Sequence, residues 1–97
     1  MHVIVWRFRP KGGREREFES AYGSKGAWVA LFSEGEGYLG SDLLRSADGE
    51  YLTLDRWTSR EAYDAFRALK AERYREIDRA CEELTESETA LGTFDSV

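Results

Sequence analysis

A β-strand that turns directly into an α-helix is predicted for residues 51–63, whose sequence is YLTLDRWTSREAY. Alternation divides the strand into one face with Leu52, Leu54 and Arg56 and a second face with Tyr51, Thr53, Asp55 and Trp57. Thr58 and Ser59 can both cap a helix, and Thr58 with Glu61 fits a capping box, in which a hydroxyl and a carboxylate satisfy free backbone N–H groups at the start of the helix. The indole of Trp57 is therefore expected close to Tyr63, where the two rings either line a pocket or fill a core.

The remaining elements follow from the same periodicities. We expect strands at 3–9, 38–46, 50–57 and 85–94, a helix from 14 that bends at 23–26 and continues to 32, and a long helical stretch at 59–84 with a bend near 70–72. Gly49 is free to adopt a positive φ, and the turn at 47–49 therefore predicts a hairpin. The order β-α-β-β-α-β predicts one α+β domain over residues 1–97, with a ferredoxin-like, four-stranded antiparallel sheet and helices on one face.

The long helical stretch carries one apolar stripe, at spacings of three and four, made of Ala62, Tyr63, Phe66, Leu69, Tyr74, Ile77, Cys81 and Leu84. This stripe is expected to pack on the sheet. Cys81 is accordingly interpreted as a buried, inert thiol rather than a nucleophile.

The second face of the sheet is expected to be apolar as well. In the first strand Ile4, Trp6 and Phe8 share one face, while Val3 and Val5 lie on the other. A monomer would expose this second face, which soluble monomers rarely do. We therefore expect a homodimer in which two copies pack these sheet faces together about a twofold axis.

Composition excludes several classes of function. The net charge is −5, and acidic and basic residues are interleaved, so we expect no nucleic-acid or anionic-membrane partner. No apolar run approaches the roughly 20 residues of a membrane-spanning helix. The single cysteine allows no disulfide within the chain, which favours a cytoplasmic location. One cysteine and one histidine, His2, cannot assemble a typical metal site, and a histidine so near a terminus is expected to be exposed.

Several short segments, spread over nearly the whole chain, match the pattern of one known family. They are VIVWRF at 3–8, Phe18 with Tyr22, GAWVALF at 26–32, GYLG at 37–40, LLR at 43–45, WTSREAY at 57–63 and GTF at 92–94. In these segments the chain resembles the antibiotic biosynthesis monooxygenase family of small dimeric α+β-barrel proteins. The family includes oxygenases and heme degraders, so the resemblance indicates the fold more sharply than the activity.

The resemblance to the family's cofactor-free quinol-type oxygenases implies three site positions. In that branch a strand Asn, a strand-end Trp and a helix Tyr hold a phenolic substrate and help to deprotonate it, so that its anion reacts with O₂ without metal or flavin. These positions fall on Thr53, Trp57 and Tyr63, and Thr53 offers a hydroxyl in place of the amide. The heme-degrading branch needs a histidine ligand where this chain has residues 76–78, so no heme, and no other cofactor, is expected.

Further candidates come from the residues themselves. Asp55 shares a face with Thr53 and Trp57; it could act as a general base if apolar neighbours raise its pKa, or it could pair with Arg7 on the adjacent first strand. One set of aromatic residues either surrounds a flat organic ligand or makes an ordinary core, namely Trp6, Phe8, Trp28, Phe32, Tyr38, Phe66 and Tyr74.

Two functions follow from these candidates. The first is a cofactor-independent monooxygenase for a small aromatic, quinol or polyketide-like molecule, which Trp57 and Tyr63 orient while Thr53 or Asp55 assists proton removal. The second is a non-catalytic dimeric module that binds a small ligand or serves as an accessory protein. The retained Trp57 and Tyr63 and an aromatic content of 13% favour the first. The missing Asn and the lone terminal histidine favour the second.

Overall fold

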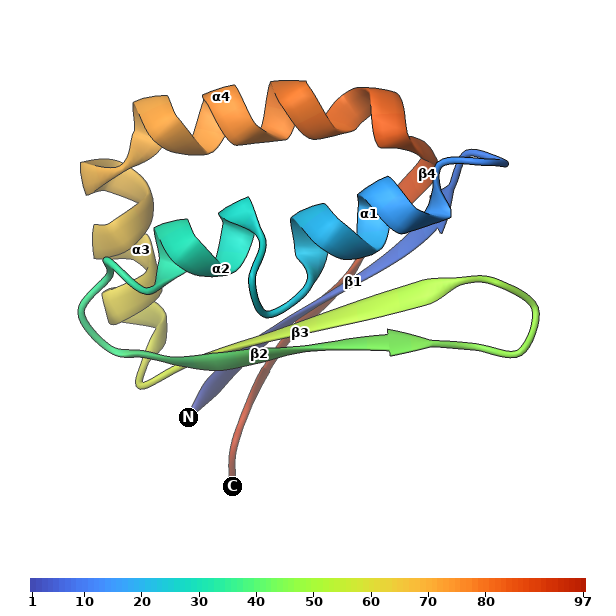
Figure 1. The fold of residues 1–97 in the computed structure, drawn as a ribbon. Coiled ribbons are helices and arrows are strands. Elements are labelled where there is room, and N and C mark those ends of the chain that lie inside the picture. The colour runs from blue at the N-terminus through green and yellow to red at the C-terminus, as the bar shows by residue number, and fades with distance from the viewer.

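One antiparallel sheet with helices on a single side makes up the computed structural model, which describes all 97 residues (Figure 1). Its strands are β1 (His2–Pro10), β2 (Tyr38–Arg45), β3 (Tyr51–Trp57) and β4 (Thr85–Asp95), in the spatial order β2-β3-β1-β4. Every neighbouring pair is antiparallel. The strand order and the helix positions confirm the predicted ferredoxin-like α+β topology.

The helices are α1 (Glu15–Tyr22), α2 (Ala27–Phe32), α3 (Arg60–Leu69) and α4 (Ala71–Cys81), followed by the short 3₁₀ turn η1 (Glu82–Leu84). The predicted bend near 70–72 is a complete break at Lys70, so α3 and α4 run in different directions (Figure 1). The break has one consequence that the apolar stripe did not predict. Leu69 ends α3 just where the chain turns away from the core, and its side chain is 80% exposed.

The β2–β3 hairpin has the predicted turn, in which Gly49 adopts a φ of +89°. Counting outward from this turn, Arg45 lies opposite Tyr51 and Ser41 lies opposite Asp55. Because opposite residues of an antiparallel pair project to the same face, Ser41 and Asp55 both face the helices. The hairpin register thus determines which side chains can meet beneath the helical layer.

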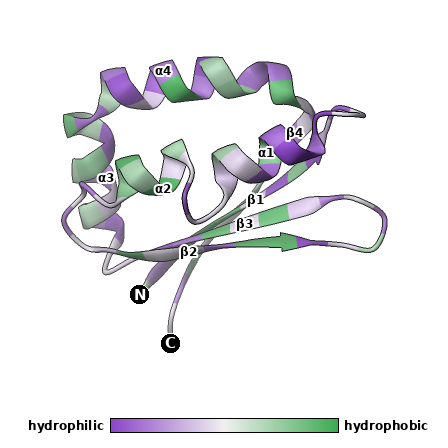
Figure 2. Cartoon of the chain, viewed as in Figure 1, coloured by the Kyte–Doolittle hydropathy of each residue, from purple (hydrophilic) through white to green (hydrophobic).

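The core lies between the sheet and the helices and consists of Ile4, Phe8, Phe18, Tyr22, Trp28, Leu31, Phe32, Tyr51, Trp57, Phe66, Cys81 and Leu84. Its aromatic rings form a continuous chain of contacts, of which the closest joins Phe18 and Tyr22 at 4.3 Å between ring centroids. Hydrophilic and hydrophobic residues alternate along α4, as expected of a helix with one buried side (Figure 2). Cys81 is buried, as predicted, and burial raises the pKa of its thiol.

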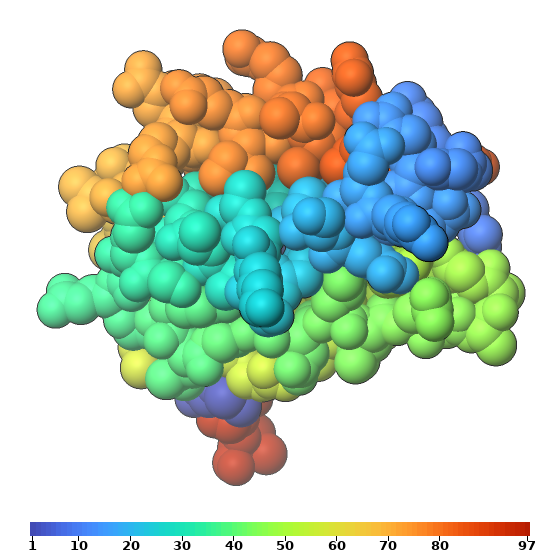
Figure 3. Space-filling view, viewed as in Figure 1, coloured from blue at the N-terminus to red at the C-terminus, as the bar shows by residue number.

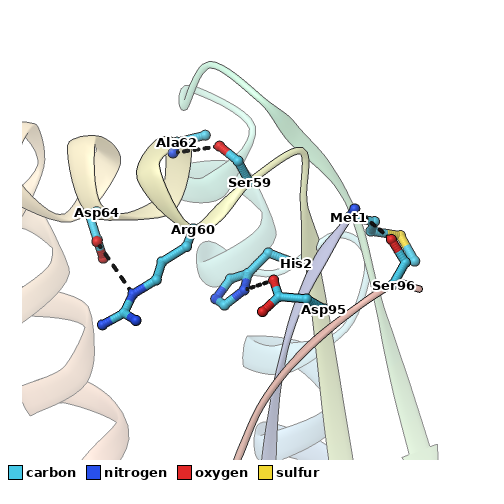
Figure 4. Close-up of polar contacts among 8 residues, drawn as sticks. All are labelled: Met1, His2, Ser59, Arg60, Ala62, Asp64, Asp95 and Ser96. Carbon is cyan, nitrogen blue, oxygen red and sulfur yellow. Dashed lines mark hydrogen bonds and ion pairs between the residues drawn. The ribbon is translucent and has the colours of Figure 1, made fainter.

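Two local expectations are wrong. His2 is only 2% exposed, because β1 lies inside the sheet and His2 Nδ1 bonds Asp95 Oδ1 on β4 at 2.8 Å (Figure 4). Of the two residues expected to be able to cap α3, Ser59 does so, and the expected capping box through Thr58 is not the cap. The Ser59 hydroxyl accepts a hydrogen bond of 3.0 Å from the backbone N–H of Ala62, which satisfies one of the free donors of the first turn (Figure 4).

The face of the sheet opposite the helices carries an apolar patch that is uncovered in the single chain, beside the charged side chains of Arg7 and of the Arg56–Asp42 pair. It presents Val3, Val5, Leu52 and Leu54, all partly exposed, and the more exposed Leu44 and Phe94 on the outer strands. No helix of the protein is long and apolar enough to cross a membrane.

Candidate functional site

A cavity of about 250 Å³ lies between the sheet and the helices. The residues proposed from the sequence that line it are Trp6, Phe8, Trp28, Phe32, Thr53, Asp55, Tyr63 and Tyr74. Trp57, Tyr38 and Phe66 do not line it but pack in the core beside it. In the space-filling view, side chains of α1 and α2 close the molecule between α4 and the β2–β3 hairpin (Figure 3).

The floor of the cavity is set by the register of the two central strands. Trp6 of β1 lies opposite Thr53 of β3, and Ile4 lies opposite Asp55. All four side chains line the cavity from the sheet. The alternation seen in the sequence therefore brings a hydroxyl and a carboxyl side by side on an otherwise apolar floor.

The walls come from the helices, at helical spacing. Tyr63 and Arg67 lie one turn apart on α3, and Tyr74 and Asp78 lie one turn apart on α4. Trp28 of α2 packs edge-on against Tyr74, with 4.9 Å between ring centroids. Because α3 and α4 meet at the break at Lys70, the two polar pairs face the same space.

Asp55 is the polar centre of the floor and is mostly buried. Ser41 Oγ donates a hydrogen bond of 2.6 Å to Asp55 Oδ1, and Ser41 Oγ lies 2.6 Å from the hydroxyl of Tyr38. The single proton of Ser41 points to Asp55, so Tyr38 is the donor in the second bond. Tyr38, Ser41 and Asp55 therefore form a hydrogen-bonded chain that ends in a carboxylate.

Burial raises the pKa of Asp55 to about 6, while the Ser41 bond and the charge of Arg56 act in the opposite direction. The alternative expectation, a pairing of Asp55 with Arg7, is wrong. Arg7 lies on the opposite face of the sheet and pairs instead with Glu50, at 3.6 Å between Nε and Oε2. Asp55 thus faces the cavity without an ion pair and is ionised at neutral pH.

A second polar cluster lies on the helical wall. Arg67 donates a hydrogen bond of 3.0 Å to the hydroxyl of Tyr63, and its guanidinium carbon lies 3.8 Å from the ring centroid of Tyr74. Burial raises the pKa of Tyr74, so this phenol stays protonated. The cluster is a set of hydrogen-bond donors on the wall, whereas Asp55 is an acceptor on the floor.

Trp57 is completely buried. Its ring packs on Phe66 at 4.9 Å, on Tyr38 at 5.2 Å and on Tyr63 at 5.5 Å between centroids. The indole Nε1–H has no hydrogen-bond partner, which is costly for a buried donor. Trp57 is therefore a core residue that supports Tyr63, and its indole nitrogen has no hydrogen-bond partner.

Two further carboxylates line the cavity, Asp78 from α4 and Glu88 from β4. Glu88 and Arg67 are exposed, so the cavity reaches solvent at this end. Burial and the nearby charge of Asp78 both raise the pKa of Glu88. No group of three or more His, Cys, Asp or Glu side chains is placed to hold a metal ion.

Sequence reasoning missed Ser41, Arg67, Asp78 and Glu88 as cavity residues. Signals for two of them were present. Arg67 follows the candidate Tyr63 by one helical turn, and Ser41 falls opposite Asp55 once the hairpin is counted outward from its turn. Asp78 and Glu88 had no such signal, because their position depends on how α4 lies over the sheet edge.

The fold and the site together define the class of protein. It is a ferredoxin-like α+β domain with an aromatic cavity between its sheet and its helices. The chain belongs to the antibiotic biosynthesis monooxygenase family, whose sequence model matches residues 1–77. This confirms the resemblance inferred from the sequence. A comparison with curated protein sequences gives no match.

Solved structures of similar fold include oxygenases. SnoaB from Streptomyces nogalater, a cofactor-independent oxygenase, is 26% identical with a TM-score of 0.79, over 99% of this chain and 92% of that one. The monooxygenase ActVA-Orf6 of Streptomyces coelicolor, solved with nanaomycin D, is 20% identical with a TM-score of 0.79, over 99% and 87%. Rv0793 from Mycobacterium tuberculosis is 24% identical with a TM-score of 0.67, over 98% and 96%. The last two comparisons support the fold alone.

Proposed function

We propose that the protein is a cofactor-independent monooxygenase that oxidises a small aromatic molecule, such as a quinol or a polyketide-like phenol, in the cavity between sheet and helices. The observation that carries this proposal is Asp55. It is a mostly buried carboxylate on an aromatic-lined floor, it has no ion pair, and its pKa of about 6 suits a general base at neutral pH. Family membership and the likeness to SnoaB support the same reaction class.

In the proposed reaction Asp55 accepts a proton from the substrate, and the electron-rich anion passes one electron to O₂. The radical pair combines to form a C–O bond and a peroxide anion. Asp55 returns its proton to the peroxide, and loss of water leaves a carbonyl. A CH₂ group and O₂ thereby become a C=O group and water, so atoms and electrons balance without another reductant.

The remaining residues are assigned roles that fit their positions. Thr53 lies beside Asp55 and offers one hydroxyl to the substrate, and Tyr63 offers a phenol from the helical wall. Trp57 holds Tyr63 from behind, as a buried residue whose ring packs against the Tyr63 ring. The substrate rings stack against Trp6, Phe8, Trp28, Phe32 and Tyr74, while Tyr38 and Phe66 act from outside the lining.

The working unit in this proposal is a homodimer. The apolar patch on the outer face of the sheet, which includes Val5, Leu54 and Phe94, supports the pairing of two copies through that face. Pairing there would leave the helical side, and with it the cavity, free in both copies.

The alternative is a non-catalytic dimeric protein that binds a small ligand or acts as an accessory protein. Two observations favour it: Thr53 stands where the oxygenase branch has an Asn, and Trp57 lies behind the cavity lining. The two candidates differ in whether O₂ is consumed.

The test is O₂ uptake with a panel of hydroquinones and anthrone-like phenols. We expect wild-type protein to consume O₂, and Asp55→Asn to lose roughly a hundredfold or more of that rate, as expected for loss of a general base. Asp64→Asn, on the exposed side of α3, serves as the control. Unchanged O₂ uptake in Trp57→Phe and Tyr63→Phe, or in Asp55→Asn, would reject the oxygenase and leave the binding protein.

A further inference from the structure

Two carboxylates at the open end of the cavity have no cationic partner. Asp78 follows Tyr74 by one helical turn on α4, and it lines the cavity with it. Glu88 lies opposite the core residue Phe8 in the β1–β4 pair, so it faces the helices from the edge strand. Neither carboxylate makes an ion pair. Burial and the nearby charges of Asp78 and Glu82 raise the pKa of Glu88, so the charge of this carboxylate is opposed rather than balanced.

The side chains that face the cavity carry an excess of negative charge. Asp55 adds a third carboxylate from the floor, and Arg67 is the basic residue of the lining. Arg67 contacts Tyr63 and Tyr74 and forms no ion pair with any of the three carboxylates. Three carboxylates therefore face one guanidinium. A ligand group with a positive charge is attracted by this set, and an anionic group is repelled.

Aromatic rings surround the same space, and the faces of such rings attract organic cations. The rings of Phe8 and Tyr22 lie 4.9 Å apart between centroids, and those of Trp28 and Tyr74 also lie 4.9 Å apart. One cation of the protein already uses this lining, because the guanidinium carbon of Arg67 lies 3.8 Å from the centre of the Tyr74 ring. No three acidic, His or Cys side chains are placed to hold a metal ion. The surroundings thus suit an organic cation better than an inorganic one.

A buried hydroxyl at this end of the cavity has no partner within the protein. Tyr22 is 9% exposed and lines the cavity, and its ring packs on Phe8, the residue opposite Glu88. The Tyr22 hydroxyl makes no hydrogen bond, which is costly for a buried polar group unless a ligand satisfies it. Burial raises the pKa of Tyr22, and the nearby charge of Glu88 adds to this effect, so the phenol stays protonated. Its oxygen can accept a hydrogen bond from a ligand N–H.

We propose that Asp78, Glu88 and Tyr22 form a subsite for a protonated amine, so that the cavity takes a small aromatic molecule with an ammonium group at its open end. The ammonium has three N–H donors, and the subsite offers two carboxylates and a phenol oxygen as acceptors. A bound cation also relieves the repulsion between the two carboxylates. The inference rests on the proposed function in taking this amine to be the substrate, whose phenol then lies toward Asp55.

Isothermal titration calorimetry at neutral pH with four compounds built on one benzene ring tests the subsite. Tyramine carries a phenol and an ammonium, para-propylphenol has a methyl group in place of the ammonium, phenethylamine lacks the hydroxyl, and para-hydroxyphenylacetate carries a carboxylate instead. We expect tyramine to bind roughly tenfold or more tighter than para-propylphenol, and the carboxylate to bind weakest. Glu88→Gln and Asp78→Asn should each reduce the preference for tyramine roughly threefold or more, and Tyr22→Phe should reduce it by a smaller factor. Binding of para-propylphenol should stay within about twofold in the two carboxylate variants, which also reports that they are folded.

Glu76→Gln is the matched control, because Glu76 is exposed on α4 outside the cavity and makes no ion pair, and its change alters the net charge equally. It should keep the wild-type preference. The proposal is overturned if wild-type protein does not prefer tyramine to para-propylphenol, if it binds the carboxylate more tightly, or if the preference survives in Glu88→Gln and Asp78→Asn. An equal loss in Glu76→Gln would also overturn it, since net charge alone would then be the cause. The preference for tyramine over phenethylamine reports on the hydroxyl at Asp55, so failure of the amine subsite and failure of the proposed function are distinguishable.

Discussion

Ser41 and Asp55 lie directly opposite one another in the β2–β3 hairpin, and the serine hydroxyl donates a hydrogen bond of 2.6 Å to the carboxylate. Ser41 is in turn the acceptor for Tyr38. This chain stabilises the ionised form of Asp55 against burial, which favours the protonated form. The acidity of the proposed base is therefore tuned from the neighbouring strand.

Removal of the Ser41 hydroxyl should shift the pH dependence of the protein. Ser41→Ala takes away a bond that lowers the pKa of Asp55, so that pKa should rise above its wild-type value of about 6. The acid limb of the rate profile should move to higher pH, and the carboxyl resonance of Asp55 should titrate at the same higher value. Carbon-detected NMR of the Asp side chains measures this directly.

Two further variants test whether the shift in the pKa of Asp55 comes from this hydrogen-bonded chain. Tyr38→Phe should raise the pKa of Asp55 by less, because it acts through Ser41. Ser33→Ala removes a hydroxyl that bonds only the Val29 carbonyl of its own helix, and it should leave the Asp55 titration unchanged. If Ser41→Ala titrates like wild type, the hydrogen-bonded chain does not tune the carboxylate.

The ionised carboxylate of Asp55 should also lower the free energy of unfolding at neutral pH. Its pKa rises from 3.8 in the unfolded chain to about 6 in the fold, so the folded protein binds this proton more tightly. Stability from this group is fully present below about pH 4 and is lost as the pH rises through about 6. Asp55→Asn should therefore raise the free energy of unfolding at pH 7 by roughly 2–3 kcal/mol, with little effect at pH 4.

Urea denaturation at the two pH values measures that difference. Asp64→Asn, which removes an exposed carboxylate of α3, should show almost no dependence on pH over the same range. Equal changes at pH 4 and pH 7 in Asp55→Asn would mean that the effect is packing rather than proton linkage.

If two copies associate through the outer sheet face, a charge placed on that face should change the oligomeric state. Leu54→Lys puts a charge in the centre of that face, so it should convert a dimer to monomers at micromolar concentration in analytical ultracentrifugation. Leu69→Lys changes an equally apolar residue that is 80% exposed on α3, and it should remain dimeric. A wild-type monomer under these conditions would contradict the proposed pairing.

Much of the fold could be predicted because alternation and turn chemistry are local. The hairpin is one example, since the turn at Gly49 determines its register and places Ser41 opposite Asp55. His2 shows where local reasoning fails. Its position near the chain end indicated exposure, but the neighbouring β4 is contributed by the far end of the chain, and it is that strand that buries the imidazole against Asp95.

The cavity was predictable only in part, because its walls depend on the break between α3 and α4. A continuous helix would have kept Leu69 on the stripe with Phe66, whereas the break exposes Leu69 and brings Arg67 and Tyr74 together. Which of the candidate residues line the cavity, and which lie in the core beside it, also depends on tertiary packing. Trp57 and Thr53 share a strand face, yet only Thr53 reaches the cavity.

The position of Trp57 against Gly35 gives a test of its role as a core residue. A Cβ added at Gly35 would lie 2.9 Å from the Trp57 ring and 2.8 Å from Phe66, so Gly35→Ala should cost about 1–3 kcal/mol of unfolding free energy. In a Trp57→Phe background the smaller ring makes room, and the same substitution should cost less, which a double-mutant cycle by urea denaturation measures. Gly12→Ala, whose Cβ meets nothing within 4 Å, is the control. Additive costs would show that Trp57 does not fill the space beside Gly35.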